Sequence, residues 1–206
     1  MNMSEINTEA AVQPHVVRHA QIIVGRDIVA DEWGVLRAGE GADAAAVAAL
    51  AIPAGKIIVP LAAWLAQRDA LAARLAAGEI GVWLAPDEQP ETLQADLAQL
   101  PVVAVDFPKF TDGRGYSIAY NLRRRLQYQG QLRAIGDVLR DQLFSMYRVG
   151  FNAYATRADR SISDALKGLS DFSETYQASV DQQQPLFRRH LRAAPAPDSG
   201  DVGYGI

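Results

Sequence analysis

The chain has 206 residues, of which 49% are hydrophobic and 21% are charged, and its formal net charge is −4. This length suits one compact domain with tails, and no apolar run approaches the roughly 18 residues that a membrane-spanning helix needs. The absence of cysteine excludes disulfides, thiol nucleophiles, zinc–thiolate sites and cysteine-ligated iron–sulfur clusters. We therefore expect no membrane association, and no cofactor or metal site is evident.

The two ends of the chain differ from its middle. Residues 1–20 are polar, lack a helix or strand period and contain no signal-peptide pattern, so we expect a disordered tail and a cytoplasmic protein. From Pro185 onward the chain is rich in arginine and then in Pro, Gly and Asp, which predicts a mobile tail over residues 181–206. Residues 21–180 are expected to form a single domain.

Within that domain, short β-branched runs alternate with helical patterns. A β-hairpin is expected first, with strands at 21–24 and 28–30 around a Gly-Arg-Asp turn, placed at a sheet edge. The five further strands predicted are Ile57–Val59, Ile80–Leu84, Val102–Asp106, Leu132–Gly136 and Asn152–Thr156. Helices are predicted between and after them, at about 61–75, 116–127, 139–149 and 162–178.

This alternation predicts an α/β fold. Buried strands spaced by 20–30 residues and separated by helices favour a mostly parallel sheet of about five βα units, with flanking helices and right-handed crossovers. Five units are too few for a closed eight-unit barrel.

Two short motifs match known sites only formally. Gly39–Ala44 fits the glycine fingerprint of dinucleotide-binding folds, but no good strand precedes it and no acidic residue follows where the ribose needs one. Gly115–Ala119 resembles a degenerate nucleophile elbow, but the preceding strand ends at Asp106 and no histidine lies in the predicted core to act as base. Neither motif predicts a site.

The loop 106–116 is the strongest functional candidate. It joins the carboxyl end of a predicted parallel strand to a helix N-terminus, which is where such folds bind ligands. A side chain at 111 or 112 can cap the helix, the glycines let backbone amides approach an oxyanion, and an arginine adds a fork of donors. A tight capped loop with a solvated arginine explains the pattern equally well. The predicted ligand-binding residues here are Lys109, Thr111, Asp112, Gly113, Arg114 and Gly115.

Later loops should converge on this one, because parallel strands end on the same side of a sheet. Asp137 and Arg140 follow one strand, and Arg157, Asp159 and Arg160 follow the next. We expect Arg140 and Arg157 to bind the anion, with Asp106 and Asp137 as candidate proton carriers. Salt-bridged helix capping is the competing interpretation, favoured for Asp141 and Asp159.

Charge is distributed unevenly along the chain. Residues 1–105 contain 6 basic and 13 acidic side chains, whereas residues 106–160 contain 10 basic and 5 acidic ones. A basic block in an acidic protein indicates a local anionic partner and not nucleic acid, which calls for a strongly basic domain. Arg123, Arg124 and Arg125 form either a solvated helix face or a docking patch for an acidic protein.

Several long motifs resemble one bacterial family of unknown function. They run from Pro60-Leu61 through Gly81–Asp87 to Val105–Ser117, and from Leu132 to Leu143 followed by Gly150-Phe151. Genes of this family tend to lie beside that of the sulfite reductase haemoprotein, and its members are often labelled probable oxidoreductases of sulfite reduction. The resemblance spans residues 20–180 and implies a place in assimilatory sulfate reduction. A cysteine often precedes the Gly-Phe pair in the family. Here Val149 stands there, which argues against a thiol mechanism in this chain.

Three functional hypotheses remain open. The first is a cytoplasmic accessory protein of assimilatory sulfate or sulfite reduction that binds an oxyanion, or a phosphate-bearing ligand, at the 106–116 loop. The second is a non-catalytic docking or assembly module for the sulfite reductase haemoprotein. The third is an enzyme that acts on a small anionic substrate through Asp106 or Asp137.

Overall fold

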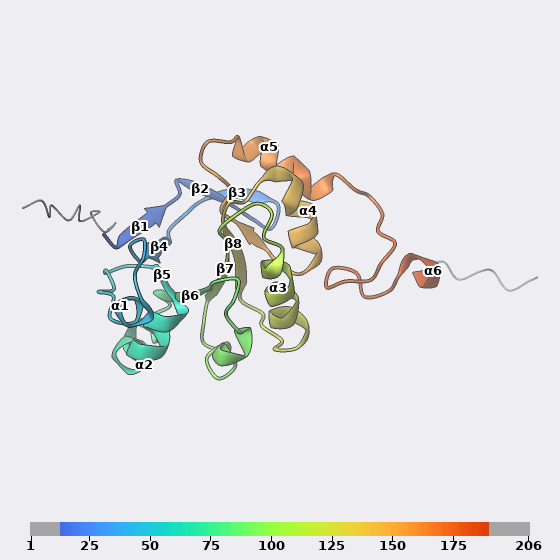
Figure 1. The fold of residues 1–206 in the computed structure, drawn as a ribbon. Helices are drawn as coiled ribbons and strands as arrows, with labels where there is room; N and C mark the ends of the chain where they lie inside the picture. Colours follow the sequence, from blue (N-terminus) through green and yellow to red (C-terminus); the bar gives the residue numbers. More distant parts are fainter. Residues whose placement is uncertain (1–12, 190–206) are drawn as a thin grey trace, which may run out of the picture.

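The computed structural model describes residues 13–189, so most of the tails predicted over 1–20 and 181–206, namely residues 1–12 and 190–206, lies outside the described part (Figure 1). Within the predicted N-terminal tail, residues 15–18 form a strand. The strands are β1 His15–Arg18, β2 Gln21–Val24, β3 Asp27–Ala30, β4 Gly34–Arg37, β5 Ile57–Pro60, β6 Ile80–Leu84, β7 Val102–Phe107, β8 Gln131–Gly136 and β9 Ala153–Tyr154. The helices are α1 Ala44–Ala48, α2 Leu61–Ala76, η1 Pro90–Leu93, α3 Arg114–Arg124, α4 Arg140–Arg148, α5 Ile162–Lys167, η2 Gly168–Ser170 and α6 Leu186–Arg189.

All these strands belong to one mixed sheet in the order β1-β4-β5-β6-β7-β8-β9-β2-β3. Strands β4 to β9 are parallel and follow one another in chain order. Antiparallel strands complete both ends, with β1 beside β4 and the β2–β3 hairpin beside β9. The α/β class and the hairpin are therefore confirmed. The expectation of a mostly parallel, five-unit sheet was wrong in detail, because three antiparallel strands and the short parallel strand β4 enlarge it.

Chain connectivity requires the sheet to curl strongly. Strands β1 and β2 are joined by only two residues, His19 and Ala20, yet they lie near opposite ends of the strand order. In a flat sheet, seven strand spacings would separate them by about 34 Å, whereas the link spans at most about 11 Å. The two ends of the sheet must therefore come together, which gives the molecule an inside and an outside.

Two hydrophobic clusters fill these two sides. Because each parallel strand neighbours its predecessor, right-handed crossovers place α2, α3 and α4 on the same, outer face (Figure 1). The larger cluster joins these helices to alternate strand residues such as Val82, Val103 and Val105. The inner cluster lies within the curl and consists of Ile22, Trp33, Val35, Ile58, Val102, Ala104, Ile135 and Ala155.

The last predicted helix is much shorter than expected. Periodicity predicted helix over 162–178, but α5 ends at Lys167 and a single 3₁₀ turn follows. Gly168 packs so closely on α4 that an added Cβ would lie 2.4 Å from the Arg140 carbonyl oxygen. Phe172 and Tyr176, expected on a buried helix face, are consequently 64% and 67% exposed.

Residues 171–189 form an arm that continues from η2 and passes the end of α4 (Figure 1). The Arg148 carbonyl oxygen accepts hydrogen bonds from the backbone amide of Val180, at 3.0 Å, and from the Ser179 hydroxyl, at 2.7 Å. The Arg148 side chain pairs with Asp181. In residues 13–189, no helix combines the length and apolarity needed to cross a membrane.

Candidate functional site

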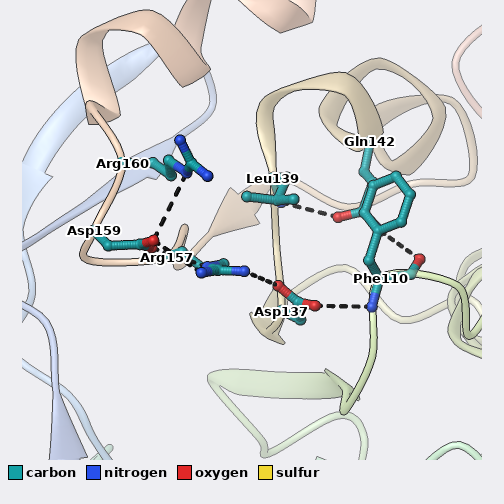
Figure 2. Close-up of polar contacts among 7 residues, drawn as sticks. All are labelled: Phe110, Asp137, Leu139, Gln142, Arg157, Asp159 and Arg160. Carbon is teal, nitrogen blue, oxygen red and sulfur yellow. Dashed lines mark hydrogen bonds and ion pairs between the residues drawn. The ribbon is translucent and has the colours of Figure 1, made fainter.

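Three connections meet at the carboxyl ends of β7, β8 and β9. They are the loop 106–116 before α3, the β8–α4 connection and the β9–α5 connection, and Figure 2 shows polar contacts among them. This is the edge at which the sequence predicted a convergence of polar side chains.

Asp137 links all three connections. Its Oδ2 accepts a hydrogen bond from the Phe110 amide at 2.9 Å, and its Oδ1 accepts one from Arg157 Nη1 at 3.1 Å (Figure 2). Arg157 also donates to both carboxylate oxygens of Asp159, at 2.9 and 2.8 Å. These bonds from Arg157 lower the pKa of the Asp159 carboxyl. Asp137 thus acts in this structure as an acceptor that fixes a loop and an arginine.

The 106–116 loop holds its own arginine. Arg114 Nε and Nη2 donate to the two oxygens of Asp112 at 3.0 and 2.7 Å, and these bonds lower the pKa of Asp112. Helix α3 begins at Arg114 with Gly113 in the N-cap position, and Asp112 Oδ1 accepts a hydrogen bond from the Arg114 backbone amide at 3.2 Å. Asp112, and not Thr111, therefore serves the start of the helix. Lys109 and Thr111 are exposed.

Neither glycine of this loop has a positive φ. Gly115 is required for packing, because a Cβ there would lie 2.7 Å from the Phe107 ring, whereas one at Gly113 would meet nothing within 4 Å. The loop therefore brings the start of α3 close to β7, and its arginine is paired inside the loop.

Asp106 has a partner that the sequence did not reveal. Arg37 Nη2 donates to Asp106 Oδ1 at 2.7 Å, and the Arg37 guanidinium lies 4.7 Å from the centre of the Trp83 ring. Arg37 ends β4, a four-residue strand that was not among the predicted ones. Its only signal was a basic residue directly after the apolar pair Val35-Leu36.

A cavity of about 490 Å³ lies between the β8–α4 and β9–α5 connections. It is lined by Val138, Leu139, Arg140, Asp141, Thr156, Asp159, Arg160, Ser161, Asp164 and Ala165. We call it the β8–β9 pocket. The first turn of α4 borders it, and Gln142 in that turn donates to the Phe110 carbonyl at 3.1 Å, which ties the 106–116 loop to the start of α4.

The polar groups of the β8–β9 pocket are engaged to different degrees. Arg140 pairs with Asp171 at 2.9 Å, whereas Arg160 has only a 3.7 Å contact with Asp159 and is largely exposed. Thr156 is 5% exposed and lines the pocket, and its hydroxyl makes no hydrogen bond to another group within residues 13–189. The pocket therefore offers a free hydroxyl and a weakly held guanidinium beside a helix N-terminus.

The predicted docking patch is not a uniform surface. Arg123 is half-buried, and its Nε donates to the Gly150 carbonyl oxygen at 2.8 Å. A Cβ at Gly150 would lie 2.4 Å from Arg123 Cγ, so this arginine packs against the end of α4. Arg124 and Arg125 are exposed. Only these two remain available to a partner.

Across residues 13–189, no group of three or more His, Asp or Glu side chains is arranged to hold a metal ion. No curated protein and no solved structure matches the chain. Residues 81–187, which begin in β6 and include every connection described above, match a family described as "Bacterial protein of unknown function (DUF934)". Because this match covers more than half of the chain, the protein belongs to that family.

Proposed function

We propose that the protein binds a small oxyanion at the carboxyl ends of its parallel strands and serves assimilatory sulfate or sulfite reduction as an accessory protein. The binding part of this proposal is carried by the β8–β9 pocket. The metabolic part is suggested by the resemblance of the motifs at 81–87, 105–117 and 132–143.

Three features of the β8–β9 pocket favour an anion, although Asp141, Asp159 and Asp164 also line it. Helix α4 presents its N-terminus there, where backbone amides without helical partners and the helix dipole favour negative charge. Arg160 can leave its long contact with Asp159 for a better acceptor, because a guanidinium binds oxyanions through two parallel hydrogen bonds. The Thr156 hydroxyl, which belongs to the pocket lining, would gain a partner in the same step.

The proposal shifts the anion from the tip of the 106–116 loop to the neighbouring pocket. Arg114 is held by Asp112 through two nitrogens, and Arg157 by two carboxylates through three, so an anion there would find few unused donors and would weaken short ion pairs. At Arg160 this cost is smallest, because its ion pair is the longest of these contacts.

Calorimetric titration with sulfite, sulfate and phosphate tests the proposal. We expect at least one anion to bind, and Arg160→Ala to weaken that binding about tenfold, the effect of losing one charged hydrogen-bonding group. Arg26→Ala is the matched control, because Arg26 is exposed in the β2–β3 turn, away from the pocket. Absence of heat with all three anions, or equal effects of the two substitutions, would contradict the proposal.

A docking role is favoured by a separate observation. The arm exposes Phe172, Tyr176 and Phe187, each more than 60% accessible, which is typical of surfaces that bind a protein partner. Co-purification with the sulfite reductase haemoprotein tests this alternative. Replacing Phe172 and Tyr176 by serine should abolish capture, whereas Arg160→Ala should leave it unchanged.

A further inference from the structure

The inner side of the curled sheet carries a polar group that the β8–β9 pocket does not use. Arg37 from β4 and Asp106 from β7 meet there, although β5 and β6 lie between their strands. Neither residue lines the β8–β9 pocket. An ion pair between strands that are not neighbours in the sheet requires the curl, so it is a product of this fold.

The surroundings hold both side chains in place. Trp83 lies under the Arg37 guanidinium and is itself fixed, because its Nε1 donates to the Leu36 carbonyl at 3.0 Å. Gly136 has φ +93°, and a Cβ there would lie 2.7 Å from Asp106 Oδ1 and 2.4 Å from the Phe107 carbonyl oxygen. Only glycine at position 136 leaves room for the Asp106 carboxylate beside the end of β8. The backbone therefore packs closely against this side chain.

Both charged groups keep hydrogen-bonding capacity. A single bond of 2.7 Å joins them, from Nη2 to Oδ1, whereas an arginine can offer five N–H donors and a carboxylate two oxygens. The side chains are 23% and 11% exposed, so the pair is largely desolvated but reaches the surface. Within residues 13–189, neither side chain makes another hydrogen bond. Oδ2 of Asp106 is thus an acceptor without a donor.

We propose that Arg37 and Asp106 form a second anion site, selective for oxyanions that carry a proton. Arg37 binds the negative oxygens, and Asp106 Oδ2 accepts the hydrogen bond from the protonated oxygen. At neutral pH monohydrogen phosphate supplies that proton, and hydrogen sulfite does so in mildly acidic solution. Sulfate has none, so its oxygen would face a carboxylate without a hydrogen between them. Sulfate is then disfavoured, because its binding would leave Asp106 Oδ2 unpaired and facing a negatively charged oxygen. This costs more binding free energy than a missing contact.

The test compares phosphate and sulfate on the full chain carrying Arg160→Ala, which removes the main arginine of the β8–β9 pocket. We expect phosphate to bind at least about tenfold more tightly than sulfate. Asp106→Asn should remove this preference, because an amide can donate to sulfate. Arg37→Ala should abolish the binding of both. Phosphate should also change tryptophan fluorescence, and Trp83→Phe should remove that signal, since Arg37 lies on this ring.

The outcomes separate this inference from the proposed function. Equal affinities for phosphate and sulfate, or unchanged phosphate binding in Arg37→Ala, would overturn the second site and leave the β8–β9 pocket standing. Phosphate selectivity that depends on Asp106, together with no effect of Arg160→Ala, would support the second site and overturn the pocket. Should Asp106→Asn fail to fold, the phosphate–sulfate comparison with intact Asp106 still decides.

Discussion

At the residue scale, the ion pair between Arg133 and Asp31 connects distant parts of the chain. Arg133 Nη1 donates to both Asp31 oxygens at 3.0 and 3.1 Å, and both side chains are 1% exposed. Removing one partner leaves a buried, unpaired charge. We expect Asp31→Ala to lower the free energy of unfolding by about 3–5 kcal/mol, measured by urea denaturation.

The neighbouring residue provides a matched control for that measurement. Glu32 pairs with Lys56 on the surface, where ion pairs contribute about 0–1 kcal/mol. Glu32→Ala should therefore have little effect. The double variant Asp31→Ala, Arg133→Met should recover part of the loss, because no buried charge remains. Equal effects of the two single substitutions would show that the buried pair has no special role.

His19 lies beside this ion pair and makes stability depend on pH. Burial lowers the pKa of His19 below 6.5. The charge of Asp31 raises this pKa and the charge of Arg133 lowers it, but burial is the largest effect. The unfolded chain therefore takes up a proton at a higher pH than the folded one. The stability contributed by the neutral histidine is fully present above pH 6.5. It is lost as the pH falls through 6.5 toward the lower pKa of the folded state.

We therefore expect His19→Gln to reduce the loss of stability on acidification. Urea denaturation at several pH values, with the variant subtracted from the unaltered chain, isolates this contribution from other groups. His15→Gln is the control, because His15 is exposed in β1. Parallel curves for His19→Gln and the unaltered chain would contradict the effect.

At the element scale, the packing of α3 on β7 depends on Gly115. An added Cβ would lie 2.7 and 2.9 Å from two atoms of the rigid Phe107 ring. We expect the steric clash in Gly115→Ala to lower the free energy of unfolding by about 1–3 kcal/mol. The higher helix propensity of alanine offsets part of this loss. Gly113→Ala should be neutral or slightly stabilising, because its Cβ meets nothing and its φ of −83° suits alanine. Thermal unfolding of both variants checks this, and equal shifts would refute the packing role.

The elements with strong local patterns were those the sequence could predict. The central strands β5 to β8 and helix α4 agree with their β-branched runs and apolar periodicity to within a few residues. Strands β1 and β4 were missed because each presents only two adjacent apolar residues, Val16-Val17 and Val35-Leu36, between polar residues or glycine. The helix expected over 162–178 failed because Gly168 must approach α4, a tertiary contact that no local period reveals.

The sequence predicted where the candidate site lies, but not which side chains pair with one another there. Parallel strands imply that 137 and 157 lie near the 106–116 loop, and the contacts of Asp137 join all three. Arg37 could not be assigned to Asp106, because their separation of 69 residues is bridged only by the curl. Arg140 likewise pairs with Asp171, which follows the unexpected end of α5.

At the scale of the whole molecule, residues 13–37 hold both ends of the sheet. They supply β1 and β4 to one end and the β2–β3 hairpin to the other. Half of the inner cluster, Ile22, Trp33, Val35 and Ile58, comes from residues before 81, and the other half comes from β7, β8 and the residue directly after β9. The family match at 81–187 therefore covers the connections of the site without the strands that complete its core.

The isolated segment 81–187 should consequently fail to form a stable domain. It would expose Val102, Ala104 and Ile135 to water, leave Arg133 without Asp31, and present unpaired edges at β6 and β9. We expect no cooperative thermal transition by circular dichroism and a tendency to aggregate, whereas the full chain melts cooperatively. Adding residues 13–80 as a separate chain should restore the transition, because that piece supplies β1 to β5 and Asp31. A cooperative transition of 81–187 alone would mean that the curl is not required for folding.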